Sequence, residues 1–324
     1  MARDLRIDTI KGILIILVVM GHIITTFDNH NVINHGVMGL IYIFHMPLFI
    51  LLSGYFSKTR DTQRASDFWR GTLGLLVTLV IFHLISSSNV LLHGGNTLRA
   101  IKRFPFGILW YLMGLVYWRI ALYYTPSALL KRPYLYLGLA LAVTILCGLS
   151  KLGNLLALQR GMNFYFFFLL GYYYRQGQLS TRWWQANKVH ALVAIVLLPL
   201  IFWLYPRCGN FMNGADHYTL HDLPQKGLIV ICSIAVSLLV FNLTRANKYL
   251  AAIGQDSLFY YLIHMYIISW VTKPVQHYLD WPRSFPFILL YTAFTLLVVF
   301  LLSKVKPIRW LTRPIPPKKQ KARP

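Results

Sequence analysis

Long runs of apolar residues, separated by short polar loops, fill most of this 324-residue chain. A helix of about 20 apolar residues is long enough to cross the hydrocarbon core of a bilayer. Ten segments reach or approach that length: 10–27, 36–57, 72–91, 107–124, 134–150, 161–174, 189–206, 227–243, 258–272 and 285–304. The pattern therefore predicts an all-α fold, a polytopic integral membrane protein with about ten transmembrane helices.

The first apolar segment carries ionisable residues at spacings that place them on one helical face. Lys11 and His22 are eleven positions apart, which returns a helix to within about 20° of its starting direction after a rise of about 16 Å. Asp8 lies on the same face and is expected to cap the helix. Ionisable groups inside a bilayer usually face the bundle interior, so these residues are functional candidates. For Lys11, snorkelling to the inner interface is the plain alternative.

The basic residues predict the orientation of the spans. An even number of spans puts both termini on one side, and an inward N-terminus places 23 of the 32 Lys and Arg residues inside and nine outside. This asymmetry follows the positive-inside rule. We therefore expect a multi-pass protein of the cell inner membrane with both termini in the cytoplasm. The same bias explains the net charge of +23 without a nucleic-acid partner.

The domain organisation predicted from the sequence is simple. Residues 1–306 form one membrane domain, and residues 307–324 form a basic, Pro-rich tail expected to be disordered near anionic lipid. The outer loop at 206–226 contains Asp and His residues but no compact ligand motif, so no metal site is predicted. The first segment lacks a small-residue cleavage pattern after His22 and should remain in the mature protein. The oligomeric state is open.

Two further histidines lie within apolar segments. His45 stands two residues before Pro47, and a proline inside a membrane helix removes a backbone hydrogen bond, so a kink is expected there. His264 is seven positions after Ser257 and shares its face, and Asp256 or Ser257 could cap that helix. Neutral imidazole is well suited to remove a proton from a hydroxyl near neutral pH, as acyl transfer to an alcohol requires. A satisfied interhelix hydrogen bond is the equal alternative for each histidine.

Four motifs follow one another along the chain in a recognisable order. They are Asp8-x-x-Lys11-Gly12 with His22, then Phe44-His45-Met46-Pro47-Leu48-Phe49-x-x-x-Ser53-Gly54-Tyr55, then Trp110-Tyr111-Leu112, and finally Gly254-x-x-Ser257-Leu258-x-x-Tyr261-x-x-His264. With these motifs the chain resembles the membrane-bound acyltransferase 3 family, and especially its fucose 4-O-acetylase-like branch, over about residues 5–304. The resemblance implies a ten-helix bundle that carries an acyl group, usually acetyl, from cytoplasmic acetyl-CoA to a sugar hydroxyl at the outer face.

The resemblance also assigns roles to individual residues. His22 matches the essential first-helix histidine of the family, and Lys11 takes the position where most members have arginine. Many relatives carry two arginines and then a proline before the third helix, whereas here only Arg70 matches. The implied cofactor-binding residues are Lys11 and Arg70, with acetyl-CoA as a co-substrate. The implied catalytic residues are His22, His45, Tyr261 and His264.

The mechanism expected from these assignments is direct transfer. His22 would deprotonate the acceptor hydroxyl, and His45 or Tyr261 could donate a hydrogen bond to the tetrahedral oxyanion. A covalent acyl-enzyme through Ser53 or Ser257 is the alternative, although the sequence places no base beside either serine.

Two other functions remain open at this stage. A proton-coupled transporter or flippase of a polar or lipid-linked solute could use the histidines as a relay, but it would favour paired acids at mid-membrane, and each Asp here lies in a loop or at a helix end. An N-acetyltransferase acting through an acetyl-histidine would differ in giving an alkali-stable amide. The acceptor is expected to be a carbohydrate or glycolipid, which the sequence does not identify further.

Overall fold

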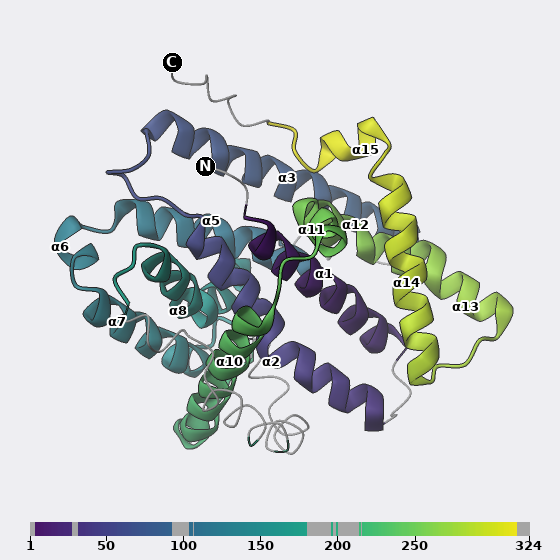
Figure 1. Ribbon diagram of the computed structural model, residues 1–324, viewed down its shortest axis with the longest axis horizontal. Coiled ribbons are helices and arrows are strands. Elements are labelled where there is room, and N and C mark those ends of the chain that lie inside the picture. The colour runs from purple at the N-terminus through teal and green to yellow at the C-terminus, as the bar shows by residue number, and fades with distance from the viewer. Residues whose placement is uncertain are drawn as a thin grey trace. The chain divides into compact units, whose positions relative to one another are not determined.

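The computed structural model describes residues 4–27, 32–92, 104–105, 107–179, 196, 199, 214 and 216–315 (Figure 1). These residues contain helices and no strand, which confirms the all-α class. Five helices within them are long and apolar enough to cross a membrane. They are α1 (Leu5–Thr26), α2 (Val32–Tyr55), α3 (Ala65–Leu92), α10 (Leu223–Leu243) and α14 (Phe285–Leu302). The count of about ten spans and the inward N-terminus stay predictions.

Shorter helices occupy most of the remaining apolar segments. They are α5 (Trp110–Tyr124), α7 (Pro133–Leu146), α8 (Leu158–Arg175) and α12 (Ser257–Ile267), which the π-helical turn η6 (Ile268–Thr272) continues. The connecting elements are η1 (Gly107–Leu109), α6 (Ser127–Leu130), η2 (Cys147–Leu149), η3 (Leu155–Ala157), η5 (Leu220–Asp222), α11 (Lys248–Gln255), α13 (Lys273–Leu279) and α15 (Lys306–Leu311). The predicted segment at 189–206 lies outside the described residues, apart from positions 196 and 199.

The chain divides into two compact units. The first unit comprises Met1–Leu52, Ser180–Asn213 and His221–Arg309, and so contains α1, most of α2, and α10 to α14. The second unit comprises Ser53–Leu179, Gly214–Leu220 and Trp310–Pro324, and so contains α3 and α5 to α8. His22, His45, Tyr261, His264 and Lys11 therefore belong to the first unit, and Arg70 belongs to the second.

The start of α1 differs from the sequence prediction. Asp4 is the N-cap, and its carboxylate accepts hydrogen bonds from the amides of Arg6 at 2.9 Å and Ile7 at 3.2 Å. A cap of this kind satisfies two of the free amides at a helix start. The prediction that Asp8 caps the helix was wrong, because the helix begins one turn earlier. Asp8 is instead buried in the first turn of α1.

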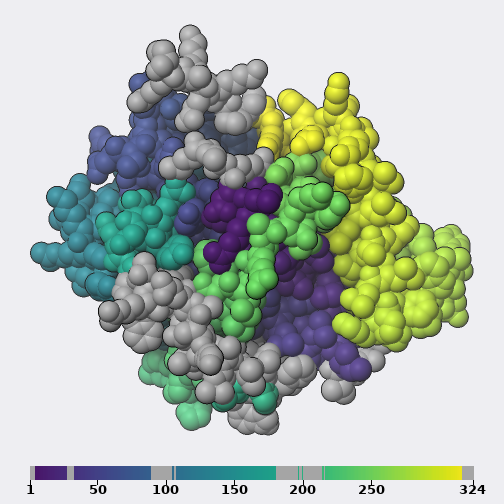
Figure 2. All heavy atoms as spheres, viewed as in Figure 1, coloured from purple at the N-terminus to yellow at the C-terminus, as the bar shows by residue number. Residues whose placement is uncertain are grey.

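Helices α1 and α11 pack with their backbones in close contact, and both lie on the face shown in Figure 2. A Cβ atom at Gly254 would lie 2.7 Å from the amide nitrogen of Gly12 and closer still to the carbonyl oxygen of Asp8. Thr9 and Asn247 join the same surfaces. The Thr9 hydroxyl accepts from the Asn247 amide at 2.9 Å, and its single proton is shared between the carbonyls of Leu5 at 2.8 Å and Asn247 at 3.1 Å. Small residues that allow such an approach are typical of membrane helix contacts.

The far half of α1 is held by an apolar cluster within the first unit. Val19 and Ile23 of α1 and its C-cap residue Phe27 pack there with residues of α2, η6 and α14, including Ile41 and Ile288. All five of these side chains are buried. One end of α1 is fixed by α11 and the other by this cluster, and His22 lies within the clustered end, between Val19 and Ile23.

The second unit is organised around α5 and α8. The indole nitrogen of Trp118 donates to the carbonyl of Gly161 at 2.7 Å, and a Cβ atom at Gly54 would collide with the backbone of Phe168. The segment at 216–218 is tied to the end of α7, where the hydroxyl of Tyr218 donates to the carbonyl of Ile145 at 2.5 Å. Burial raises the pKa of the Tyr218 phenol, so it remains a hydrogen-bond donor at neutral pH.

The predicted tail and the cap of α12 also differ from expectation. Residues 306–311 form α15, so the expected disorder of 307–324 does not hold at its start. Arg309 in this helix binds both carboxylate oxygens of Asp256, at 2.7 and 3.0 Å. Asp256 stands at the N-cap of α12, but its side chain makes no capping hydrogen bond. The carboxylate that was expected to cap the helix binds the guanidinium instead.

Candidate active site

The first unit brings two of the predicted histidines together. His22 on α1 and His264 on α12 have ring centroids 5.3 Å apart, with the ring planes inclined at 37°. The helices that carry them are in contact. His264 is fully buried, whereas His22 is partly exposed. The pair therefore joins one accessible imidazole to one that is enclosed by protein.

The hydrogen bond of His264 determines which of its ring nitrogens carries the proton. Its Nδ1 lies 2.9 Å from the carbonyl oxygen of Tyr260. A carbonyl can only accept, so in the neutral ring Nδ1 carries the proton and Nε2 carries a lone pair. Among the residues that the structure describes, this buried Nε2 has no hydrogen-bond partner. An unsatisfied buried polar atom costs about 1–3 kcal/mol, and native proteins retain few of them, so this atom is a strong functional candidate.

His45 on α2 joins the same group. Its Nδ1 donates to the carbonyl of Ile41 at 2.7 Å, which again leaves the lone pair on Nε2 of the neutral ring. Tyr42 packs edge-on against His45, with 5.1 Å between ring centroids. A Cβ atom at Gly21 would lie 3.2 Å from the Tyr42 ring, so Tyr42 sits directly beside the residue that precedes His22. Tyr42 thus links His45 with the part of α1 that carries His22.

Tyr261 completes the cluster of predicted catalytic residues. Its ring centroid lies 6.2 Å from that of His264, and the side chain is buried. The π-helical turn η6 begins four residues after His264. Such turns occur frequently at functional sites, because they shift the register of the side chains that follow. His22, His45, Tyr261 and His264 thus form one group, which we call the histidine cluster.

The two predicted cofactor-binding residues lie in different surroundings. Lys11 Nζ is 3.6 Å from a carboxylate oxygen of Asp8, which confirms that these residues share one face of α1. The Lys11 side chain keeps 23% of its surface exposed. Arg70 is exposed near the start of α3 in the second unit. The roles of both residues toward acetyl-CoA stay predictions.

Sequence reasoning missed Tyr42 and the significance of Gly21. Tyr42 lies one helical turn before His45. The sequence does not distinguish it from an aromatic residue that only packs against its neighbours. A glycine directly before His22 was the available signal, because small residues in membrane helices mark close approach by a neighbour.

Ser53 and His217, which lie outside the histidine cluster, each have a hydrogen-bond partner. The Ser53 hydroxyl lies 2.7 Å from the phenol of Tyr111, both within the second unit. In the loop that we predict to lie outside, Nδ1 of His217 donates to the carbonyl of Gly148 at 3.0 Å. Across the described residues, no group of three or more His, Cys, Asp or Glu side chains is placed to hold a metal ion.

Comparison with known proteins identifies the family to which the chain is similar. A family model described as an acyltransferase domain, of the acyltransferase 3 type, matches residues 4–304. The nodulation protein NolL of Sinorhizobium fredii is 40% identical over 82 residues, which cover 24% of this chain and 22% of that protein. The nodulation protein NolL of Mesorhizobium japonicum is 34% identical over 113 residues, covering 28% of this chain and 29% of that protein. The matched stretch is thus less than a third of either relative. No solved structure matches the chain significantly.

Proposed function

This chain belongs to the acyltransferase 3 family of membrane O-acyltransferases, and from that membership we propose that it moves an acetyl group from cytoplasmic acetyl-CoA to a sugar hydroxyl. The acceptor would be an envelope or exported polysaccharide, or its glycolipid precursor, reached from the inner membrane. One observation carries the proposal. The ring of His22, which is partly exposed, lies 5.3 Å from the ring of His264, whose buried Nε2 has no hydrogen-bond partner among the described residues.

In the proposed reaction His22 is the general base. Its imidazole takes the proton of the acceptor hydroxyl while that oxygen attacks the thioester carbon, and the carbonyl electron pair moves onto oxygen. When the tetrahedral adduct collapses, the carbon–sulfur bond breaks and the thiolate recovers the proton from His22. Atoms and charge balance without any other reactant, and the ester and the free thiol are the products.

His264 would support the charged form of His22. An imidazolium in a buried site needs an electron-rich partner, because burial disfavours the charged form. The lone pair on Nε2 of His264 is such a partner, and the Tyr260 carbonyl fixes the proton on the opposite nitrogen. This parallels the general arrangement in which a third group orients and stabilises a catalytic imidazole.

The position of the proton on His45 also decides whether this residue can donate a hydrogen bond to the oxyanion. In neutral His45 the proton is held by the Ile41 carbonyl, so Nε2 of His45 can accept a hydrogen bond but cannot donate one. Tyr261 has a hydroxyl that donates in its neutral form. Of the two donors considered for the oxyanion, the geometry therefore favours Tyr261 over His45, and His45 would instead hold the acceptor hydroxyl or a water molecule.

The donor would approach from the inner end of α1. Lys11 lies eleven positions before His22, which corresponds to a rise of about 16 Å. A pantetheine arm could bridge that distance while Lys11 remains near the anionic part of the donor. The partial exposure of Lys11 beside Asp8 is consistent with this position.

The test is acetyl transfer in isolated membranes. Radiolabelled acetyl-CoA is supplied to membranes that contain wild-type protein, His22→Ala or His277→Ala at matched expression. His277 is an exposed histidine of α13 in the same unit and serves as the control. We expect label in envelope glycans for the wild type and the control, lost under mild alkali as an ester. Label that persists with His22→Ala would refute the assigned base, and an alkali-stable product would indicate an amide.

A further inference from the structure

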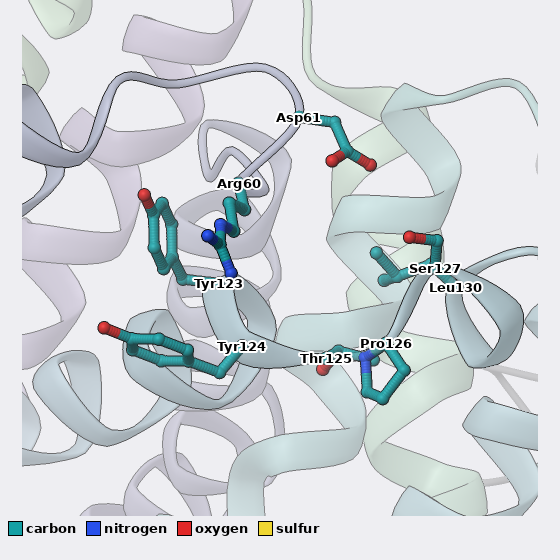
Figure 3. Close-up of a pocket in the computed structure, with 8 residues that line it drawn as sticks. All are labelled: Arg60, Asp61, Tyr123, Tyr124, Thr125, Pro126, Ser127 and Leu130. Carbon is teal, nitrogen blue, oxygen red and sulfur yellow. The ribbon is translucent and has the colours of Figure 1, made fainter.

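A small pocket in the second unit lies apart from the residues assigned so far (Figure 3). Its volume is about 150 Å³, and it is formed between the loop after α2 and the corner that joins α5 to α6. The loop contributes Arg60 and Asp61, and the corner contributes Tyr123, Tyr124 and Ser127 among others. Since sites for whole drug-sized ligands span about 300–1,000 Å³, a pocket of this size suits one end of a larger molecule.

The loop side of the pocket is a rigid turn. The amide of Thr62 donates to the carbonyl of Thr59 at 3.2 Å, and the amide of Thr59 donates to the Thr62 hydroxyl at 3.0 Å. Arg60 and Asp61 are therefore the two central residues of a closed turn. Thr59 is buried, and its side chain interacts with the Tyr172 phenol of α8. The charged side chains are thus presented by a backbone that is already ordered, which lowers the entropy lost on binding.

The corner side of the pocket is aromatic and equally well fixed. Tyr123 is buried and stacks on Phe68, with ring centroids 3.8 Å apart and planes inclined at 16°. Tyr124 packs edge-on against Tyr123 and keeps 53% of its surface exposed. The Thr125 hydroxyl is held by Tyr136 at 2.8 Å. An exposed tyrosine ring that is supported by fixed neighbours can stack with a flat ligand at small conformational cost.

The two charges of the pocket point to its opposite sides. In Figure 3 the guanidinium of Arg60 extends toward the two tyrosines, and the carboxylate of Asp61 extends toward Ser127. A guanidinium matches a phosphate group, an exposed aromatic ring matches a base, and a carboxylate accepts hydrogen bonds from an amino or hydroxyl group. One ligand that carries all three features is a phosphorylated nucleoside.

We propose that this pocket binds the phosphorylated adenosine end of the acyl-CoA donor, an inference that rests on the proposed function. Arg60 pairs with a phosphate, Tyr124 stacks on the adenine, and Asp61 accepts from the adenine amino group or a ribose hydroxyl. In the predicted orientation the loop at 58–70 and the α5–α6 corner both face the cytoplasm, where the donor is found. Lys131 and Arg132, which follow α6, add positive charge near this corner.

The test measures initial rates of acetyl transfer with two donors, acetyl-CoA and S-acetylpantetheine, which lacks the nucleotide. Arg60→Ala should raise the KM for acetyl-CoA about tenfold, the effect of losing one charge-assisted hydrogen bond at a partly exposed site. Its kcat, and its rates with S-acetylpantetheine, should equal those of the wild type. Arg64→Ala is the matched control, since Arg64 is an exposed arginine of the same loop that does not line the pocket.

A second measurement separates a nucleotide site from a simple anion site. Binding of radiolabelled adenosine 3′,5′-bisphosphate is followed in nanodiscs of zwitterionic lipid, with phosphatidylglycerol added as a competitor. Asp61→Asn should weaken binding, because one carboxylate oxygen is replaced by an amide nitrogen that only donates, and the remaining oxygen is a weaker, uncharged acceptor. Tighter binding would indicate a simple anion site, and displacement by phosphatidylglycerol would indicate a lipid headgroup site; either result overturns the proposal.

The outcomes also separate this inference from the proposed function. If the wild type transfers acetyl and Arg60→Ala behaves as Arg64→Ala does, the pocket assignment is wrong and the function stands. If the wild type transfers no acetyl group, the function fails. In that case, binding of adenosine 3′,5′-bisphosphate that Arg60→Ala abolishes would still support a nucleotide site, and absent binding would overturn it.

Discussion

Replacing Gly254 with alanine should disrupt the contact between α1 and α11. The new Cβ would lie 2.7 Å from the Gly12 amide nitrogen, whereas ordinary van der Waals contact begins at 3.4 Å. The two backbones must therefore separate by at least 0.7 Å there, and by more at the Asp8 carbonyl. Overpacking of this kind costs about 1–3 kcal/mol. The separation also weakens the two hydrogen bonds between Thr9 and Asn247, each contributing about 0.5–1.5 kcal/mol.

Alanine also improves helix propensity over glycine by about 1 kcal/mol, which offsets part of this loss. The net decrease in the free energy of unfolding should be about 2–4 kcal/mol. The change should also lower acetyl transfer, because α12 follows α11 directly and carries His264. A displacement near 1 Å at a catalytic group can reduce the rate by up to about 100-fold.

The assay compares thermal unfolding of detergent-solubilised Gly254→Ala with that of Gly227→Ala. Gly227 is a helical glycine of α10 at which a Cβ atom would meet nothing within 4 Å. We expect the control to unfold at or above the wild-type temperature and Gly254→Ala to unfold well below it. If the two variants unfold at the same temperature, the close backbone contact between α1 and α11 is wrong.

Two further changes probe the same structure. Thr9→Val removes the oxygen that accepts from the Asn247 amide at 2.9 Å, so it should lower the free energy of unfolding by about 1–3 kcal/mol. Thr9→Ser keeps that oxygen and should retain most of the stability. Equal unfolding temperatures for the two variants would contradict the role of this hydrogen bond. Ser53→Ala should leave acetyl transfer nearly unchanged, because the serine hydroxyl is held by the Tyr111 phenol at 2.7 Å, a group too weakly basic to activate it. Its complete inactivation, with loss of a radiolabelled acyl-enzyme, would instead establish a covalent mechanism.

Much of the local structure could be predicted from the sequence, because local rules decide it. The face shared by Asp8 and Lys11 follows from helical spacing alone, and the 3.6 Å ion pair confirms it. The cap of α1 could not be placed in the same way. Asp4 and Asp8 are both plausible caps by residue type, and the choice depends on where the helix begins.

The histidine cluster required information that no local rule supplies. His22 and His264 are separated by most of the chain, and their 5.3 Å approach depends on how closely α1 packs with α11 and α12. The glycines that allow this approach were present in the motifs, but the sequence does not show that Gly12 and Gly254 face each other. The ion pair of Asp256 with Arg309 was missed for a similar reason, since its partner lies beyond the last long apolar segment.

The central claim is that His22 and His264 act together in one proton transfer. It is tested most directly by the kcat for acetyl transfer in a cycle of wild type, His22→Ala, His264→Ala and the double variant. We expect His22→Ala to lower kcat by about 10²–10⁴-fold, the usual contribution of a general base, and His264→Ala to lower it less. The double variant should be no slower than His22→Ala, because His264 acts only through His22. Retention of activity by His22→Ala, or losses that multiply in the double variant, would contradict the account.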